Sequence, residues 1–189
     1  ILYVCGKFLK SQGKLNGNTV VTTVMSNMGL YKAFEAEGIN YEQTAVGDKY
    51  VAENMLENNY SIGGEQSGHV IFSRYAATGD GILTSLMIME ACVEQKATLC
   101  DLAKEMKVYP QILRNVRVAD KKTARENPKV VEAVEAAARA LSTDGRILVR
   151  ESGTEPLIRV MVEAGTEEIC AEHVNNVVRV MEEEGLIVE

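Results

Sequence analysis

Hydrophobic and polar positions in the first half of the chain predict strands and helices in alternation. The β-branched run NTVVTTV at residues 18–24 has the length and composition of a strand. A helix capped by Ser26 is expected to follow, with Gly38 just past its end. A strand over 39–46 and a helix over 48–58 then repeat this order. Such alternation indicates helices layered on a sheet.

The rest of this half predicts further elements of both kinds. A helix is expected over 1–11, and short strands are expected over 60–64 and 70–73. The sequence GDG at 79–81 opens the long helix ILTSLMIMEACVEQ, which is apolar on nearly every side and is therefore expected to be buried. A shorter helix is expected over 98–107.

The second half of the chain shows a different pattern. QILRNVRV, RILVR and LIRVMVEA predict three strands, the last two forming a long hairpin. KKTAREN is expected to be a polar connector between the first of these strands and a helix that Asn127 caps, with Pro128 at its first position. A final helix is expected to begin at Thr166. The order is β-α-β-β-α.

This change of pattern predicts two domains. Residues 1–107 are expected to form an α/β domain, with a mixed sheet and helices on both of its faces. Residues 108–189 are expected to form a small α+β domain with two layers, of which one is an antiparallel sheet. A single sheet running through both halves would contradict this division.

Composition narrows the classes of protein to consider. The content of 46% hydrophobic and 25% charged residues is that of a soluble globular protein. The net charge of −7 argues against a nucleic-acid partner, which requires a basic face. No apolar run approaches the roughly 18 residues of a membrane-spanning helix, so no membrane partner is expected. Four scattered cysteines without metal-binding spacing indicate reduced thiols in the cytoplasm: Cys5, Cys92, Cys100 and Cys170.

The loop between the last two predicted strands carries more polar groups than a turn requires. A tight hairpin needs only Asn-Gly or Asp-Gly. Here Ser152 and Thr154 add hydroxyl groups, Gly153 allows close approach of a ligand to the backbone, and Arg150 and Arg159 flank the loop. Converging N–H groups, hydroxyls and guanidinium groups are the donors that bind phosphate. The loop is therefore a candidate phosphate site.

An ordinary hairpin loop is the alternative interpretation of the same residues. In that case, the two flanking arginines would pair with Glu151 and Glu155. A carboxylate beside a phosphate site would be unfavourable. On a strand, however, Glu151 is expected to point to the opposite side from Arg150.

The segment GGEQSGH is a second candidate site. If its backbone is extended, Glu65 and Ser67 point the same way and together suit the hydroxyl or amino groups of a sugar. His69 could exchange protons near neutral pH, and Lys49, in the helix expected over 48–58, could reach an anion. The alternative is a glycine-rich turn with a capping carboxylate and a solvated histidine.

Taken in order, several stretches resemble the second half of an α-D-phosphohexomutase. They are VMSNMGL, VGDKYV, GGEQSGHVIF, ATGDGILTSL and VRESGTEPLIRVMVEA. The resemblance covers essentially the whole chain, and its most specific part is GEQSGH followed by R-x-SGTEP. One departure is Glu151, where relatives often have proline or alanine. Residues 1–107 would then be the third domain of this family, with its sugar-recognition loop, and residues 108–189 the fourth, with its phosphate-binding loop.

The resemblance also implies roles for individual residues. Glu65 and Ser67 would bind sugar hydroxyls, His69 would transfer a proton beside the reacting centre, and Lys49 matches a basic position of the family. The phosphate that is not transferred would be held by the other loop, through Arg150, Ser152, Gly153 and Thr154.

The implied reaction is reversible phosphoryl transfer between the 6- and 1-positions of glucosamine phosphate, through a bisphosphate, on the route to UDP-N-acetylglucosamine. The family's phosphoserine and Mg²⁺ loops have no match here, so the metal and the missing N-terminal domains would lie outside this chain. Since the chain begins without methionine, it is expected to be a fragment. Three alternatives remain open: a fragment specific for mannose or glucose phosphates, a non-catalytic phosphosugar-binding module, and a protein-interaction domain.

Overall fold

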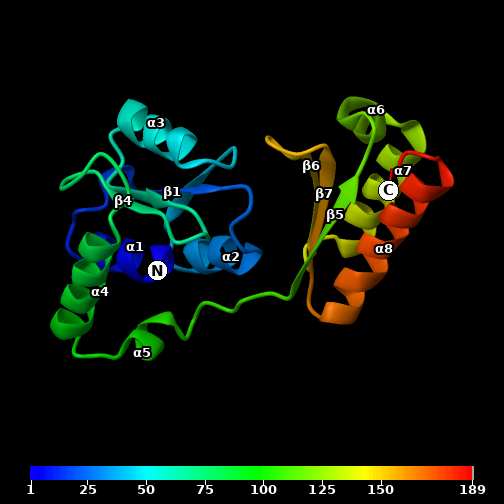
Figure 1. Ribbon diagram of the computed structural model, residues 1–189. Helices are drawn as coiled ribbons and strands as arrows, with labels where there is room; N and C mark the ends of the chain where they lie inside the picture. The colour runs from blue at the N-terminus through cyan, green and yellow to red at the C-terminus, as the bar shows by residue number, and fades with distance from the viewer. Residues whose placement is uncertain (189) are drawn as a thin grey trace. The chain divides into compact units, whose positions relative to one another are not determined.

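The computed structural model describes residues 1–188, and the chain divides into two compact units. Unit 1 is Ile1–Val108 and unit 2 is Tyr109–Glu189. Each unit has its own sheet (Figure 1) and its own buried hydrophobic clusters. The two units are therefore described one after the other.

Unit 1 is built on a four-stranded mixed sheet of order β2-β1-β3-β4. β1 (Thr19–Thr23) pairs in parallel with β2 (Asn40–Thr44) and with β3 (Ile62–Gly64), whereas β4 (Val70–Phe72) runs antiparallel to β3. Every residue of β1 is buried. A continuous β-branched run is typical of such a central strand, because both of its faces are covered.

Helices cover both faces of this sheet, with α3 above it and α1 and α2 below it in Figure 1. One face packs against three helices: α1 (Leu2–Ser11), α2 (Met28–Ala36) and α4 (Gly81–Gln95). The other face packs against α3 (Asp48–Asn58). Successive side chains of a strand point to opposite faces, so Val20 belongs to the first cluster and Val21 to the second.

Helix α2 begins one residue later than predicted. Asn27 is the cap, and its side-chain oxygen accepts a hydrogen bond from Gly29 N at 3.0 Å. Ser26 is buried, and its hydroxyl bonds to that of Thr22. The prediction of Ser26 as the cap is therefore wrong. Serine and asparagine cap helices equally well, so the sequence does not distinguish these two neighbours. Gly38 follows the helix with a φ of 59°, as predicted.

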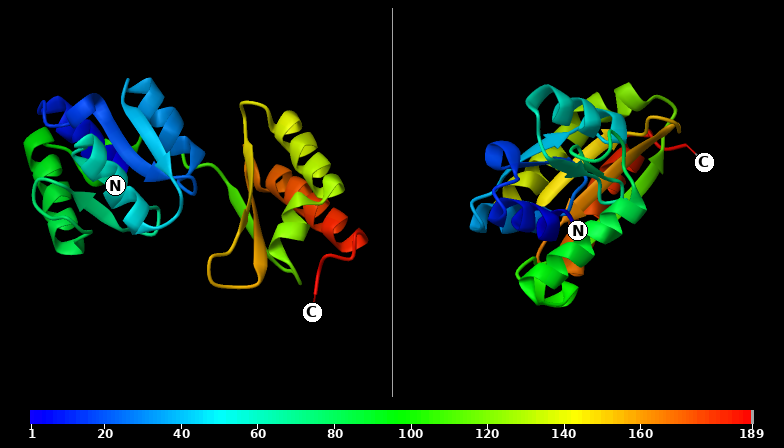
Figure 2. Two further views of the ribbon diagram at one scale, coloured as in Figure 1. Left: turned by 90° about the horizontal axis from the view of Figure 1, so that it is seen from above. Right: turned by 90° about the vertical axis from the view of Figure 1, so that its left-hand side faces the viewer.

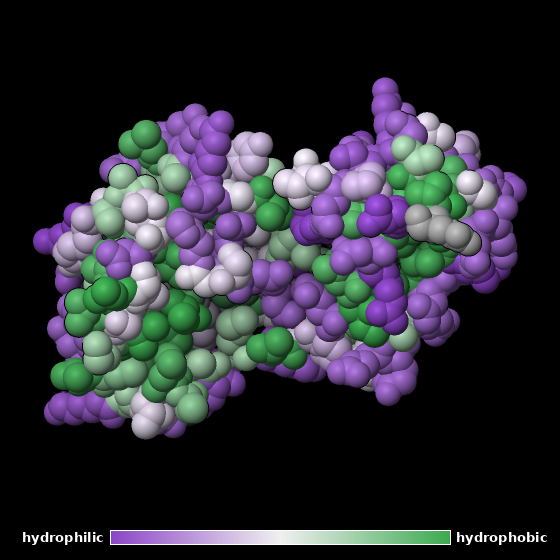
Figure 3. Space-filling view, in the orientation of Figure 1, coloured by the Kyte–Doolittle hydropathy of each residue, from purple (hydrophilic) through white to green (hydrophobic). Residues whose placement is uncertain are grey.

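The prediction that α4 is buried on nearly every side is also wrong. Its inner face buries Thr84, Met87 and Ala91. Its outer face exposes a row of apolar side chains (Figure 3): Ile82, Leu86, Met89 and Val93. An apolar helix is buried all round only where a further layer covers it, and α4 is an outer helix of unit 1. The next helix, α5 (Leu99–Ala103), is shorter than predicted.

Unit 2 is built on a three-stranded antiparallel sheet of order β5-β7-β6. The strands are β5 (Gln111–Arg117), β6 (Arg146–Glu151) and β7 (Leu157–Glu163). Helices lie on one side of this sheet (Figure 2): α6 (Lys121–Glu126), α7 (Pro128–Leu141) and α8 (Glu167–Glu183). The alternate residues Ile158, Val160 and Val162 of β7 are fully buried in the cluster that these helices help to form. The two predicted fold classes are confirmed.

Helix α6 stands where the sequence predicts a polar connector, and that prediction is wrong. Asp120 caps this helix by accepting a hydrogen bond from Thr123 N at 2.6 Å. Only Ala124 of the helix is buried, so its sequence carries almost no hydrophobic periodicity. Helix α7 follows with Asn127 as its cap and Pro128 at its first position, as predicted.

Two cysteines of unit 1 should react at very different rates with iodoacetamide. Cys5 is buried in α1, and this burial raises the pKa of its thiol to about 11, whereas Cys100 is exposed on α5. Because the thiolate is the reactive form, labelling at pH 8 should modify Cys100 first and Cys5 only after denaturation. Timed labelling followed by peptide mass spectrometry measures both rates. Similar rates in the folded chain would contradict the burial of Cys5.

Candidate functional site

The glycine-rich segment at 65–69 forms a tight turn between β3 and β4. Glu65 N donates to His69 O at 2.8 Å, and Gly68 N donates to Glu65 O at 3.1 Å. The backbone is therefore not extended, and the expectation that Glu65 and Ser67 point the same way loses its basis. Ser67 is exposed in the middle of the turn.

The carboxylate of Glu65 joins this turn to the start of α3. Its Oε1 accepts a hydrogen bond from Gly47 N at 3.0 Å. Gly47 has a φ of 134°, which disfavours residues with a side chain. Lys49, in the first turn of α3, is exposed, and its ammonium group lies 3.6 Å from the carboxylate of Glu53. Glu65 is thus positioned by the backbone, whereas Lys49 extends from the helix surface.

Two groups from other segments contact the ring of His69, one in the loop before α4 and the other at the start of α3. Its Nε2 accepts a hydrogen bond from Gly79 N at 3.2 Å and lies 3.7 Å from Asp48 Oδ2. A nitrogen that accepts a hydrogen bond carries no proton, so of the two neutral tautomers this contact favours the one with its proton on Nδ1. Sequence reasoning missed these two positioning groups, although GDK and TGDG were visible at the starts of α3 and α4.

Replacing Gly79 by alanine should displace the His69 ring. A Cβ at position 79 would lie 2.5–2.7 Å from three atoms of the imidazole, closer than real contacts allow. Loss of the Gly79 hydrogen bond should change the proportion of the two neutral tautomers. The ¹⁵N shifts of the imidazole measure this proportion, and the chain has only two histidines.

Gly81→Ala is the matched control for this substitution. A Cβ at Gly81 would meet nothing within 4 Å. The control should therefore leave the ¹⁵N shifts of His69 unchanged. Identical spectra for both variants would show that Gly79 does not position the ring.

In unit 2, Arg150 and Arg159 lie directly opposite each other on β6 and β7. They occupy the sheet face away from the helices, because the next pair, Glu151 and Ile158, lies on the helical side. Burial, and after it the positive charge of Arg159, lower the pKa of Arg150. Like charges opposite each other destabilise a sheet. A shared anion would remove this repulsion.

Neither arginine is fully satisfied by the protein. Both Nε atoms are buried and donate no hydrogen bond within the described residues. Arg159 donates through Nη2 to Ser152 Oγ at 3.5 Å and to Glu155 Oε2 at 3.2 Å. No ion pair with Arg150 is formed in residues 1–188. A buried donor without an acceptor costs about 1–3 kcal/mol, so the pair is suited to an external acceptor.

The interpretation of the loop as an ordinary hairpin is only half matched by these contacts. Arg159 does pair with Glu155. Glu151 instead pairs at 3.4 Å with Arg125 of α6, on the helical side of the sheet. The expectation that Glu151 points away from Arg150 therefore holds, and its carboxylate does not compete with an anion at the arginines.

The rest of the loop combines a fixed base with an accessible tip. Ser152 is 1% exposed; its N donates to Leu157 O at 3.0 Å and its Oγ accepts from Glu155 N at 3.3 Å. Gly153 and Thr154 are exposed. Lys121 of α6 donates to Ser152 O at 2.8 Å. Sequence reasoning missed this lysine as a support of the loop, although it belongs to the cluster Lys121-Lys122-Arg125.

Two further features bear on the class of protein. Residues 1–188 contain no group of three or more histidine, cysteine, aspartate or glutamate side chains that could hold a metal ion. Across the same residues, every helix is too short or too polar to span a bilayer.

Comparison with known proteins identifies both units. The family profile described as phosphoglucomutase/phosphomannomutase, alpha/beta/alpha domain III, matches residues 1–109. The profile of the C-terminal domain of the same family matches residues 113–180.

Curated relatives are similar over the whole chain. A phosphoglucosamine mutase of Lachnospira eligens is 60% identical over 188 residues, covering 100% of this chain and 42% of the relative. A phosphoglucosamine mutase of Bacillus subtilis is 53% identical over 184 residues, covering 97% of this chain and 41% of the relative. The chain thus spans about two fifths of the length of these relatives.

Solved structures show the same fold at lower identity. An N-acetylglucosamine-phosphate mutase of the α-D-phosphohexomutase superfamily, in a substrate complex, has a TM-score of 0.77 at 22% identity, over 95% of this chain and 42% of that one. An Aspergillus fumigatus N-acetylphosphoglucosamine mutase, in complex with GlcNAc-6P and magnesium, has a TM-score of 0.76 at 18% identity, over 97% and 42%. The resemblance seen in the sequence motifs is confirmed. With profile matches to both units, the chain belongs to the phosphoglucomutase/phosphomannomutase family, of which it comprises domain III and the C-terminal domain.

Proposed function

We propose that the chain is the substrate-binding part of a phosphoglucosamine mutase, which interconverts glucosamine 6-phosphate and glucosamine 1-phosphate through a bisphosphate. Relatives at 60% and 53% identity carry this name. The observation that carries the proposal is the pair Arg150 and Arg159, adjacent on one sheet face with their Nε atoms unsatisfied. Two neighbouring guanidinium groups suit the several oxygens of a phosphate group.

Unit 2 would hold the phosphate that is not being transferred. Arg150 and Arg159 would donate from the sheet, while Ser152, Gly153 and Thr154 would donate from the loop. In a reaction through a bisphosphate, the intermediate must turn round between the two transfers. A site that recognises phosphate and little of the sugar accepts either end, which the composition of this loop supports.

Unit 1 would recognise the sugar and move a proton. Glu65 and Ser67 would accept and donate hydrogen bonds to its hydroxyl or amino groups, and Lys49 would add a positive charge nearby. His69 would exchange a proton at the reacting centre. Its contact with Gly79 supports this role, because it orients the ring and favours one of its neutral tautomers.

The phosphoryl carrier and Mg²⁺ are assigned to parts of the protein outside this chain. The metal would neutralise charge on the transferred group, and the described residues gather no acidic cluster to hold it. The proposed partners are the phosphosugar and the remaining domains. The proposed compartment is the cytoplasm, where free thiols stay reduced.

The chain alone should not convert glucosamine 6-phosphate, whereas the protein with its remaining domains should. The assay contains purified protein, Mg²⁺, a trace of glucosamine 1,6-bisphosphate and substrate, and it follows the 1-phosphate. Turnover by the chain above a protein-free blank, surviving repurification, would mean that the chemistry lies in these residues.

The same assay decides between sugars. With the full-length protein, kcat/KM should be highest for glucosamine 6-phosphate among the glucosamine, glucose and mannose 6-phosphates. A preference for mannose or glucose would overturn the proposed specificity while leaving the phosphate site intact. No turnover of any of them would favour a non-catalytic binding module.

A further inference from the structure

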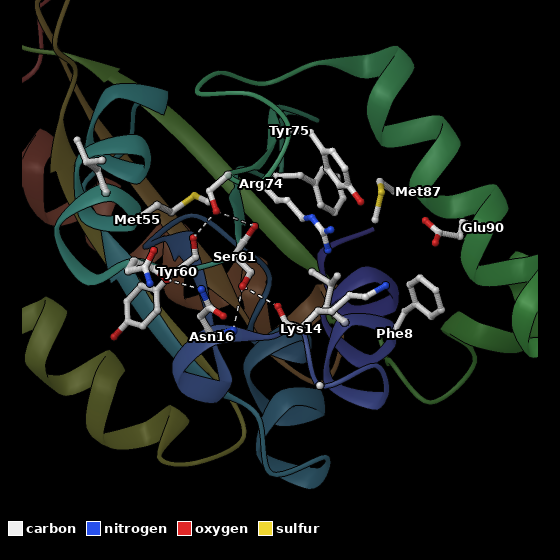
Figure 4. Close-up of a pocket in the computed structure, with 16 residues that line it drawn as sticks. Phe8, Lys14, Asn16, Met55, Tyr60, Ser61, Arg74, Tyr75, Met87 and Glu90 are labelled. Atoms are coloured by element: carbon white, nitrogen blue, oxygen red, sulfur yellow. Dashed lines mark hydrogen bonds between the residues drawn. The ribbon is translucent and has the colours of Figure 1, made fainter.

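A hollow of about 530 Å³ lies in unit 1. It lies at the end of β3 opposite to the 65–69 turn. Its lining includes Asn16 and Ser61, which precede β1 and β3, whereas the turn follows the end of β3 (Figure 4). None of the residues proposed to contact the sugar lines it. Its volume is within the range of small-molecule sites.

The floor of the hollow is apolar. It is formed by side chains that are at most 6% exposed: Phe8, Leu9, Met55, Phe72 and Met87. They come from α1, α3, β4 and α4. At the rim, Tyr75 is 55% exposed and presents an aromatic ring beside this floor. Polar side chains also line the hollow, among them Asn16, Asn59 and Ser73. Tyr75 beside the apolar floor therefore offers a surface for a flat ring, and the polar groups offer partners at its rim.

Two cations, Lys14 and Arg74, extend toward the same space from different loops, as Figure 4 shows. Within the described part of the chain, neither forms an ion pair. The guanidinium group of Arg74 lies 5.7 Å from the centre of the Tyr75 ring. Glu90 of α4 also lines the hollow and can accept a hydrogen bond. The rim therefore provides a binding position for an anion beside an aromatic surface.

The loops that carry the two cations are fixed to the sheet. Ser61 Oγ accepts from Asn16 N at 2.9 Å and donates to the Lys14 carbonyl at 2.7 Å. Ser73 Oγ, next to Arg74, donates to Tyr60 O at 2.8 Å. Because these backbones are held in place, a ligand pays less to order the site.

We propose that this hollow binds a nucleoside phosphate. Its phosphate would lie between Lys14 and Arg74, and its base would lie over Tyr75 and the apolar floor, with Glu90 accepting from a ribose hydroxyl or the base. The site is separate from the arginine pair, which belongs to unit 2.

Uridine 5′-monophosphate is the probe for this site. The titration uses the 189-residue chain carrying Arg150→Ala, so that the arginine pair of unit 2 contributes little. NMR signals of the methionine methyls and tyrosine rings report binding, and Met55, Met87 and Tyr75 are expected to shift. Absence of shifts at these residues would overturn the proposal.

A double variant tests the two cations. Lys14→Ala with Arg74→Ala should weaken binding of the nucleotide by about a hundredfold or more, since each removes a charge-assisted contact. The control, Lys104→Ala with Lys122→Ala, changes the net charge equally and should bind as before. Equal affinity in both double variants, or inorganic phosphate binding as tightly as the nucleotide, would refute the site.

Discussion

Replacing Arg150 by alanine should weaken binding of glucosamine 6-phosphate to the full-length protein by roughly one to two orders of magnitude. The substitution removes a charge-assisted contact to phosphate worth about 1.5–3 kcal/mol, which corresponds to this loss of affinity. The fold should be as stable as before or slightly more stable, because the change also removes a buried, unsatisfied Nε and its repulsion with Arg159. Calorimetric titration and thermal unfolding measure the two effects.

Two further variants make this result specific. Arg125→Ala removes a neighbouring guanidinium that pairs with Glu151 on the helical side of the sheet, so it should leave the affinity unchanged. Arg150→Lys keeps the charge but loses the bidentate geometry, and it should give an intermediate affinity. If Arg150→Ala binds the phosphosugar as tightly as the parent protein, the proposed phosphate site is wrong.

Replacing Phe34 by alanine should destabilise unit 1 by about 3–5 kcal/mol, the range for removing a large buried aromatic ring. Phe34 is fully buried in α2, and its ring centre lies 6.3 Å from that of Tyr3 and 6.4 Å from that of Tyr41. Gly6 of α1 faces it, and a Cβ there would lie 3.5 Å from the Phe34 ring. The cavity would therefore open between α1, α2 and the sheet.

The loss should be confined to unit 1, since the two units have separate cores. Hydrogen exchange measured peptide by peptide should show faster exchange in residues 1–108 and unchanged exchange in unit 2. Phe34→Leu, which keeps most of the volume, should cost less than about 1.5 kcal/mol. Equal exchange in both units of the alanine variant would mean that they unfold together.

The sequence predicts most strands and helices because their burial leaves a periodic pattern. Prediction from the sequence fails where an element leaves no such pattern, or an ambiguous one. Helix α6 buries only Ala124, so nothing in KKTAREN distinguishes it from a loop. Helix α4 is apolar on the side that unit 1 leaves exposed, and a sequence pattern does not say which apolar face lacks a cover. The cap of α2 is misplaced because Ser26 and Asn27 are adjacent and equally suitable.

Some contacts of the candidate sites could be predicted from the sequence, and others could not. The hairpin indicates that Arg150 and Arg159 come close, because both flank one loop. The contacts of His69 with Gly79, and of Lys121 with the Ser152 carbonyl, join separate segments of the chain. Such contacts depend on how loops pack, which local patterns do not encode. The turn at Glu65 could not be inferred either, because GGEQSGH is compatible with extended and turning backbones.

The charges on the outer strands of unit 2 have a consequence for solubility. In the order β5-β7-β6, the outer strands carry Arg114 and Arg117 on one side and Arg150 on the other. A strand of another molecule that approached either edge would meet guanidinium groups, and charged edges discourage edge-to-edge pairing. Arg150 thus opposes the pairing of β6 with a strand of another molecule. A variant that neutralises it would be a folded protein with a greater tendency to aggregate at high concentration.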